Sequence, residues 1–502
     1  MTYTRGIRMK IVSLPPPAAS FFESMRDVGY TLETAFADII DNSLTAKSTE
    51  IDILVDSGEE PFRICIADNG IGMDYETLLE AMTYASRDPR TTRDRFDLGR
   101  FGLGLKLASL SQGRRLTVVT RRNNSVHAGI WDQDYIDEHN DWLLQIPDDP
   151  ESILESIPLN IDLDKSGTVV IWEKLERIDG LPETGFDQTA FVKRIDDVRA
   201  HLELVFHRFL SGEAGTKKCG ISINNLPLDG IDPFNSKHPA TGIDPDLPEK
   251  INEDVSFQVF TLPHHSRVDK RDWEKYGLED GYLKNQGLYI YREKRLIIYG
   301  TWLRLARQTA LNQLTRVKID ITNRVDDAWG ITLDKSRAKL PPIVRDTLRN
   351  RIERIGASSK RAYTRRGQAL TTEEYRPTWK EIQQNNQITY QVNHDNPVMK
   401  RFLDNLSGDN RKEFGKILTF IGSTIPLDAM YARLSNDPSS VGVEQVDQAT
   451  LKEWCLQHYD FLMEMGNNDQ DRAINMMRSI EPFKSNWDDT EYILEAERPN
   501  DD

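Results

Sequence analysis

Three short stretches of polar residues and glycines interrupt the apolar runs near the N-terminus, and they constrain the fold more than any other feature. They are ADIIDNSLTA (37–46), ADNGIGM (67–73) and GRFGLGLK (99–106). Each lies within or beside a segment whose apolar periodicity predicts a regular element. Each also has a physical reason to contact the same bound ligand.

The first stretch lies on a predicted helix, residues 31–47. Asp38 and Asn42 are four residues apart and therefore share one face. An Asn amide oxygen can bind Mg²⁺, and a nearby carboxylate can take a proton from water. A solvated polar helix face would give the same pattern. The apolar stripe of this helix comprises Leu32, Ala35, Phe36, Ile39, Ile40 and Leu44.

The second stretch follows a predicted buried strand, 63–67, and turns at Asn69-Gly70 and Gly72. Asp68 stands at the end of the strand, where its carboxylate can accept a hydrogen bond from an exocyclic amine such as that of adenine. The glycines would let the backbone approach a ligand. D-x-G-x-G is short, and an ordinary Asx-turn hairpin would also explain it.

In the third stretch, Gly99, Gly102 and Gly104 precede a predicted helix. Glycines at a helix N-terminus expose backbone N–H groups to an anion, and the helix dipole favours the anion there. Lys106 adds a positive charge. The stretch is not a Walker A loop, because Leu105 separates Gly104 from the lysine.

Together with Ser166-Gly167-Thr168-Val169-Val170-Ile171, these stretches resemble the GHKL ATPases (gyrase, the ninety-kilodalton heat-shock chaperones, histidine kinases and MutL). They are similar to that family's N box, D-x-G-x-G box, glycine-rich box and G-T strand. The resemblance covers 20–180 strongly and 185–345 more loosely, and it is nearest to MORC-like and prokaryotic MORC-like members. It implies an α+β fold: a Bergerat α/β sandwich, a ribosomal-S5-like transducer domain and a small helical C-terminal domain.

The resemblance also implies roles for individual residues in binding ATP and Mg²⁺. Asn42 would bind Mg²⁺, and Asp38 would be the general base. Asp68 would accept a hydrogen bond from the adenine amino group, and Thr168 would reach the adenine side. The pocket would be shaped by Gly70, Gly72 and Met73, and the phosphates would be capped by Gly102, Leu103, Gly104 and Lys106.

Two positions depart from the family pattern. The family's general base is usually a glutamate. The side chain of Asp38 is shorter by one methylene, so its carboxylate lies further from the attacking water, and the rate of proton transfer depends steeply on that distance. Hydrolysis could therefore be slow or use a repositioned water. Thr45 stands where many members have an aspartate, which would weaken the water-mediated contacts to adenine while leaving the main one.

The predicted transducer contains a hairpin around Arg292-Glu293-Lys294. In the implied arrangement a loop lysine of this domain contacts the γ-phosphate, and Lys335 is the candidate, although a solvated loop lysine would look the same. The polar, arginine-rich residues 86–97 occupy the position of the ATP lid.

We expect an N-terminal strap (1–20), the ATP-binding domain (21–180), the transducer (185–345), a basic helix and linker (346–370) and an acidic helical domain (371–502). Residues 345–366 carry eight basic and two acidic side chains. Such a helix can be a solvated surface or a phosphate-binding patch, for which Arg361, Arg365 and Arg366 are candidates. Residues 371–502 carry 13 basic and 24 acidic residues, which favours docking of a protein partner, with a disordered tail at 488–502.

Composition sets further limits. A net charge of −16 argues against indiscriminate nucleic-acid binding but allows a local basic patch. No apolar run is long enough to predict a membrane span, and the N-terminus lacks the apolar region of a secretion signal. The three widely spaced cysteines indicate neither a disulfide framework nor a zinc site, and they fit a reducing cytoplasm.

The predicted activity is Mg²⁺-dependent ATP binding with slow hydrolysis. The favoured function is an ATP-gated homodimeric clamp on double-stranded DNA, because MORC-like members act on DNA and some defend against foreign DNA. The alternative is a chaperone-like or signalling scaffold whose acidic domain recruits a protein. A sensor histidine kinase, a type II topoisomerase and a MutL-like endonuclease are poorly supported, since their diagnostic histidine helix, tyrosine domain and metal cluster are not found.

Overall fold

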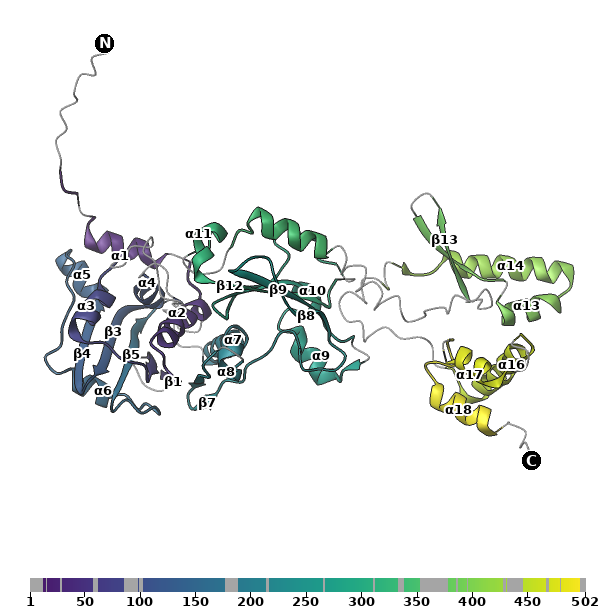
Figure 1. The fold of residues 1–502 in the computed structure, drawn as a ribbon, viewed down its shortest axis with the longest axis horizontal. Coiled ribbons are helices and arrows are strands. Elements are labelled where there is room, and N and C mark those ends of the chain that lie inside the picture. Colours follow the sequence, from purple (N-terminus) through teal and green to yellow (C-terminus); the bar gives the residue numbers. More distant parts are fainter. Residues whose placement is uncertain are drawn as a thin grey trace, which may run out of the picture. The chain divides into compact units, whose positions relative to one another are not determined.

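The computed structural model describes residues 12–14, 16–27, 29–56, 62–84, 98, 103–176, 188–213, 216–264, 267–309, 312–332, 338–352, 378–384, 387–394, 396–427, 430, 446–465, 469–478 and 480–496. The chain forms two compact units. The first comprises Met1–Pro263, Arg271–Gln308 and Gln313–Ile352, and the second comprises the remainder (Figure 1).

The first unit begins with a seven-stranded sheet in the order β4-β3-β5-β2-β1-β6-β7. All neighbouring strands are antiparallel except β1 and β6, which are parallel. The strands are β1 (Glu50–Asp56), β2 (Arg63–Asp68), β3 (Gly113–Arg122), β4 (Ser125–Asp132), β5 (Ser166–Leu175), β6 (Gly220–Ile223) and β7 (Leu226–Pro227).

Helices cover one face of this sheet (Figure 1). The central helix, α2, begins at Thr31, whose side chain accepts a hydrogen bond from the Thr34 N–H in a reciprocal capping box. It contacts α4 and α7. The helices of this part are α1 (Ala18–Arg26), α2 (Leu32–Thr45), α3 (Tyr75–Met82), α4 (Gly104–Gln112), α5 (Gln133–His139), α6 (Pro150–Glu155), α7 (Gln188–Val205) and α8 (His207–Ser211).

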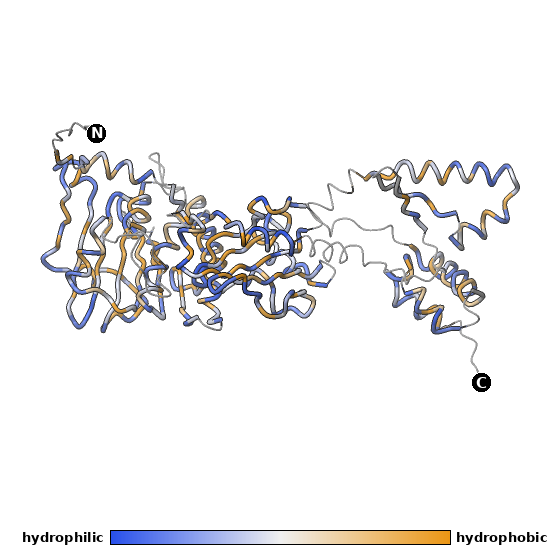
Figure 2. Tube along the Cα trace, turned by 45° about the horizontal axis from the view of Figure 1, so that its top comes forward, coloured by the Kyte–Doolittle hydropathy of each residue, from blue (hydrophilic) through white to orange (hydrophobic). Residues whose placement is uncertain are grey.

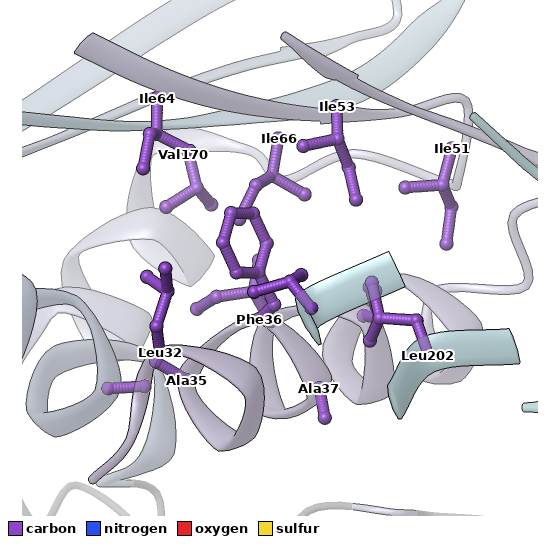
Figure 3. Close-up of a cluster of buried hydrophobic side chains, with 14 of the residues drawn as sticks. Leu32, Ala35, Phe36, Ala37, Ile51, Ile53, Ile64, Ile66, Val170 and Leu202 are labelled. Atoms are coloured by element: carbon purple, nitrogen blue, oxygen red, sulfur yellow. The ribbon is translucent and has the colours of Figure 1, made fainter. Parts of the chain in front are cut away.

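The main core lies between α2 and the sheet. Figure 3 shows Phe36 of α2 pointing toward isoleucines of β1 and β2, with Leu202 of α7 beside it. The centre of the Phe36 ring lies 5.1 Å from the ring centre of Trp172 in β5. The predicted apolar stripe of α2 is confirmed, because all of its members are buried except Leu44, which is partly buried.

The opposite face of the sheet is covered by α6 and the loop that follows it. Ile157 and Leu163 of this segment pack on Cys65 and Val169, and the prediction that Cys65 is a core residue is confirmed. The sheet is therefore buried on both sides, which explains the nearly continuous apolar run of β2.

The predicted division near residues 180–185 does not coincide with the sheet. Strands β6 and β7 were expected in the second domain, yet β6 pairs with β1, with Ile221 opposite Ile51. Helix α7 likewise contributes Val198 and Leu202 to the core beneath α2. The first sheet and its core thus extend to about the end of β7, because side chains of α7 complete the core beneath α2. The outer limits of the domains stay a prediction.

A five-stranded sheet follows in the order β11-β10-β12-β9-β8. The predicted hairpin is confirmed as β10 and β11, whose ends pair Arg292 with Arg295. The classification of this part as a ribosomal-S5-like transducer stays a prediction. The elements are β8 (Gly242–Lys250), β9 (Val255–Thr261), α9 (Lys270–Gly277), α10 (Gly281–Lys284), β10 (Gly287–Arg292), β11 (Arg295–Thr301), β12 (Thr315–Ile321), η2 (Asn323–Val325), α11 (Asp326–Trp329) and a helix over residues 342–352.

The sequence had predicted a helical C-terminal domain, but the C-terminal unit is not wholly helical. It begins with an antiparallel hairpin, β13 (Trp379–Gln384) and β14 (Gln387–Val392). The predicted disordered tail is also wrong over residues 488–496, which lie in a helix with Leu494 buried. The helices are α13 (Pro397–Asp404), α14 (Gly408–Ser423), α16 (Gln448–Met465), α17 (Gln470–Met477) and α18 (Trp487–Ala496).

Apolar residues follow the strands of both large sheets in Figure 2, whereas the helices alternate between apolar and polar residues. Among the helices that the structure describes, none is both long and apolar enough to cross a bilayer.

Candidate functional site

Helix α2 carries the first group of predicted site residues. Asp38 is buried, and its Oδ2 accepts a 2.7 Å hydrogen bond from the Tyr30 hydroxyl. Asn42 lies one turn further along and is exposed. The helix thus presents a held carboxylate and an accessible amide, which are the two groups predicted to serve water and Mg²⁺.

Asp68 lies at the end of β2 and is 5% exposed. Its Oδ2 accepts a 2.9 Å hydrogen bond from Ser43 Oγ, and its Oδ1 accepts one of 2.8 Å from the Gly70 N–H. Burial raises the pKa of Asp68 to about 6, although both hydrogen bonds act in the opposite direction. Ser43 belongs to α2, so the predicted adenine acceptor is tied directly to the helix of Asp38 and Asn42.

Thr168 of β5 stands opposite Asp68 in the sheet register. Its hydroxyl lies 3.1 Å from that of Thr120 in β3, which also accepts a 2.8 Å hydrogen bond from the Met73 N–H. The structure therefore brings Asp68, Thr168 and Met73 together, as the sequence predicted, and adds Thr120 at their junction.

The glycines of the second stretch are required by the fold itself, and their predicted role in the approach of a ligand stays a prediction. A Cβ on Gly70 would lie 2.8 Å from the Ala46 carbonyl oxygen, and one on Gly72, where φ is +62°, would lie 1.9 Å from that of Arg121. Close contact with the protein's own backbone therefore already requires glycine at both positions.

Helix α4 begins at Gly104, after Leu103 at its N-cap, and contacts α2. A Cβ on Gly104 would lie 3.2 Å from Asp38 Oδ2, so the start of α4 directly adjoins the candidate base. The first N–H groups of a helix have no partner within the helix and attract anions. The first and third predicted stretches thus meet at one point.

Lys106 differs from its prediction. Its side chain is buried, and Nζ donates hydrogen bonds of 2.8 Å and 3.0 Å to the carbonyl oxygens of Ala81 and Thr83 at the end of α3. Carbonyls at a helix C-terminus attract a cation. In this structure the ammonium therefore joins α4 to α3, and its predicted phosphate contact has no geometric support.

Several predicted residues lie outside the described residues. They are Gly102, Lys335, Arg361, Arg365 and Arg366, together with the predicted lid, 86–97. Their roles stay predictions.

Sequence reasoning missed three side chains that hold the site. Ser43 lies within the first stretch, where its position after Asn42 could have marked it. Tyr30 directly precedes the helix cap, and a search for donors near Asp38 could have found it. Nothing local marked Thr120, which meets Asp68 and Thr168 only through pairing of β3, β5 and β2.

The donor set fits a magnesium ion that is held mainly by its nucleotide. The described residues contain no group of three His, Cys, Asp or Glu side chains able to hold a metal by themselves. Mg²⁺ in nucleotide sites usually keeps waters and takes only one or two protein ligands besides the phosphates. The exposed amide of Asn42, one turn from Asp38, meets that need.

A helix bearing Asn42, packed on a mixed sheet whose β2 ends in Asp68, is the arrangement of a Bergerat nucleotide-binding domain. Residues 30–168 match the family model described as "Histidine kinase-, DNA gyrase B-, and HSP90-like ATPase". Residues 30–168 therefore form a GHKL ATPase domain, as the sequence motifs had predicted.

Individual relatives support the same family. The chain is 34% identical to mouse ATPase MORC2B over 98 residues, which are 18% of this chain and 9% of the relative. It is 36% identical to the putative MutL protein homolog 1 of Schizosaccharomyces pombe over 107 residues, 21% of this chain and 15% of the relative. Human ATPase MORC2 is 30% identical over 98 residues, again 18% and 9%. The chain thus matches only a small part of the length of these relatives.

Proposed function

We propose that the protein binds Mg²⁺·ATP and hydrolyses it slowly. The observation that carries the proposal is the double attachment of α2. Through Ser43 it is bonded to Asp68, and through Asp38 it adjoins the first residue of α4. One helix therefore connects the group that suits adenine with the helix N-terminus that suits phosphate.

In this proposal Asn42 holds Mg²⁺ on the phosphates, and Asp38 accepts the proton of the attacking water. The ion neutralises charge on the transferring phosphoryl group when it is bound. Asp68 accepts a hydrogen bond from the adenine amino group beside Thr168. Backbone N–H groups at Leu103 and Gly104 face phosphate oxygens, and Lys335 supplies a cation at the γ-phosphate.

Steady-state ATP turnover and nucleotide affinity of the full chain test the proposal. Asn42→Ala should abolish Mg²⁺-dependent binding, and Asp38→Asn should abolish turnover while binding persists. Asp196→Asn is the matched control, since this exposed carboxylate lies on α7. Equal turnover in the wild type and in both site variants would refute the assignment.

We further propose that ATP brings two copies together as a clamp on double-stranded DNA. The clamp would serve in defence against foreign DNA. The described part of the basic segment supports a phosphate-binding face. On the helix over 342–352, Val344 and Leu348 are buried, while Arg345 and Arg349 are exposed four residues apart. Two exposed arginines on one helix face suit the DNA backbone.

A second candidate, recruitment of a protein partner, is favoured by a different observation. Helix α14 of the acidic C-terminal unit exposes Ile417, Phe420 and Ile421, with Phe420 68% accessible. Exposed apolar side chains at helical spacing are typical of protein docking surfaces.

The three cysteines are free and buried, which fits the reducing cytoplasm proposed for either function.

Retention of DNA at rising salt distinguishes the two candidates. A DNA clamp should lose retention steeply with salt, and Arg345→Glu/Arg349→Glu should weaken it, with a further loss on reversing Arg361, Arg365 and Arg366. Glu substitutions at Lys412 and Lys416, on α14, are the charge-matched control. DNA binding that is absent at low salt, with a monomer in saturating unhydrolysable ATP analogue, would refute the clamp and leave recruitment as the function.

A further inference from the structure

The tip of the β10–β11 hairpin, in the second sheet of the first unit, contacts the ATP site through two buried arginines. Arg292 and Arg295 are paired across the hairpin end and are 1% and 5% exposed. Neither position belongs to the motifs by which the ATP site was recognised.

Arg295 contacts the helix that carries Asp38 and Asn42. Its Nε lies 3.4 Å from Oδ1 of Asp41, a carboxylate that is 1% exposed. The guanidinium also lies 5.5 Å from the centre of the Phe206 ring, in the core beneath α2. Removing one partner of such a buried pair is strongly destabilising, because it leaves the other charge buried and uncompensated.

Arg292 joins two other segments. Its Nε and Nη2 donate to the two carboxylate oxygens of Asp326, at 2.8 Å and 2.7 Å, and its Nη1 donates to the carbonyl oxygen of Leu98 at 3.0 Å. The bidentate pair fixes the plane of the guanidinium, so the remaining nitrogen reaches Leu98 in one orientation.

Thr45 completes a closed path of contacts between these groups. Its hydroxyl donates to the Asp41 carbonyl oxygen at 2.8 Å and accepts from the Leu98 N–H at 3.3 Å. The path therefore runs from Asp41 through Thr45, Leu98 and Arg292 to Arg295 and back to the Asp41 carboxylate. Thr45, which departs from the family pattern, here fixes the end of α2.

We propose that Arg292 and Arg295 are positioning residues of the ATP site, which orient α2 so that Asn42 and Asp38 face the triphosphate. The inference rests on the proposed ATPase function. It means that hydrolysis depends on how the hairpin of the second sheet sits against α2, so a partner that shifts this sheet changes the ATPase rate without touching the nucleotide.

The position of these contacts decides what they control. Asp41 lies between Asp38 and Asn42 in the sequence, whereas Asp68 belongs to β2, in the middle of the first sheet. Ser43 of α2 bonds Asp68, but Asp68 keeps its place in β2 and its hydrogen bond from the Gly70 N–H. Loss of the arginine contacts therefore affects the phosphate and metal end of the site more than the adenine end. General loss of stability would affect both ends alike.

The test measures kcat, and the affinity for ADP with and without Mg²⁺, in the full-length chain. The variant Asp41→Asn/Arg295→Gln removes both buried charges together, so that neither is left unpaired. We expect kcat and Mg²⁺-dependent affinity to fall by about 10–100-fold, as for other groups that orient a metal ligand or base. Affinity for Mg²⁺-free ADP should change by a much smaller factor.

Arg208→Lys is the matched control. Arg208 is also buried, and it pairs with Asp320 at 2.6 Å, but it joins α8 to β12. This variant should lower stability without separating the two ADP affinities. If the double variant resembles Arg208→Lys, or weakens ADP equally with and without Mg²⁺, the inference is wrong.

Two milder variants keep the inference testable should the double variant fail to fold. Arg292→Lys keeps a cation beside Asp326 but loses the fork that also reaches Leu98. Thr45→Val, at an exposed position, replaces the hydroxyl with a methyl group of similar size. Each should lower kcat with the same separation of ADP affinities, and together they should cost less than the sum of their single effects, because they interrupt one path.

Wild-type protein that binds no Mg²⁺·ATP would overturn both the function and this inference, whereas active wild type with unaffected variants would overturn the inference alone.

Discussion

The Tyr30 hydroxyl donates a 2.7 Å hydrogen bond to Asp38 Oδ2, and a side chain on Gly104 would come within 3.2 Å of the same oxygen. The carboxylate is thus held between the segment before α2 and the first residue of α4. Glycine at position 104 thus leaves room for this carboxylate, and the length of aspartate places its Oδ2 against the Tyr30 hydroxyl, which gives a reason for aspartate in place of glutamate at position 38.

Removing the tyrosine hydroxyl should impair chemistry more than binding. In Tyr30→Phe, Asp38 loses the donor that fixes its orientation, and kcat should fall by up to about 10²-fold, while KM for ATP changes little. Steady-state turnover at saturating Mg²⁺ measures both. Tyr289→Phe is the control, because that hydroxyl, on β10 of the second sheet, donates a 2.8 Å hydrogen bond to the carbonyl oxygen of Asn285 at the end of α10. An equal loss in the two variants would point to stability rather than to orientation of the base.

Restoring the family's glutamate should not improve the enzyme. Asp38→Glu adds a methylene beside Tyr30 and Gly104, and overpacking of a buried site costs about 1–3 kcal/mol. We expect a lower free energy of unfolding and no gain in kcat. Thermal unfolding and turnover of the variant measure this, and faster turnover at unchanged stability would show that the site has room for the longer side chain.

The parts of the site that follow from local pattern were predictable from the sequence. The 3.6-residue stripe of α2 fixed which face is buried, and so placed Asp38 and Asn42 on the adjoining face. The apolar run of β2 followed by Asn69-Gly70 placed Asp68 at a strand end. These relations depend only on residues within one turn or one strand.

The contacts that the sequence did not reveal join distant segments. Thr120 meets Met73 across 47 positions, and Arg292 meets Leu98 across 194. Periodicity gives the type of an element but not its neighbours, so neither contact has a local signal. The same reason explains why β6 was assigned to the second domain, since its pairing with β1 joins segments far apart in the sequence.

Composition misled the prediction at the C-terminus. The strands of β13 and β14 hold few apolar residues, so an alternation of period two barely shows. Helix α18 has several acidic residues, yet Trp487, Ile493 and Leu494 pack in the core of its unit. A short apolar stripe outweighs net charge when a neighbouring core is available.

The raised pKa of Asp68 should make the ligand-free protein less stable at neutral pH than its amide variant. Because burial raises this pKa from 3.8 to about 6, the folded state holds the proton more tightly than the unfolded state. The resulting stability is fully present below pH 3.8 and is lost as pH rises through 6. At pH 7 to 8, Asp68→Asn should therefore raise the free energy of unfolding by up to about 3 kcal/mol.

The amide fits the same hydrogen bonds, since Ser43 Oγ can accept as well as donate. Thermal unfolding of both proteins between pH 4.5 and pH 8 checks the prediction, and the difference should shrink toward acid pH. A constant difference across this range would mean that the carboxylate does not titrate there. The variant should also lose the stabilisation by ATP that the wild type shows.

Nucleotide affinity should follow the ionisation of Asp68. The adenine amino group is a donor, and the ionised carboxylate, which predominates only above about pH 6, accepts its hydrogen bond more strongly than the protonated acid does. Affinity for ADP should therefore be nearly constant above pH 7 and fall by up to about tenfold between pH 7 and pH 5. Fluorescence titration with a labelled ADP in Mg²⁺-free buffer isolates this effect from metal binding. Inosine diphosphate, which lacks the amino group, is the ligand control and should bind weakly without this pH dependence.

The glycines beside Asp68 should be intolerant of any side chain even without nucleotide. In Gly72→Ala the new Cβ would meet the Arg121 carbonyl oxygen at 1.9 Å, so strand β3 must move away from the turn. We expect a loss of about 3 kcal/mol or more in the free energy of unfolding. Gly29→Ala separates this clash from backbone strain, because Gly29 also has positive φ, +45°, but has open space around it. That variant should lose only about 1–2 kcal/mol. Equal losses in the two variants would show that φ alone requires glycine at position 72, and that the close contact with β3 can relax.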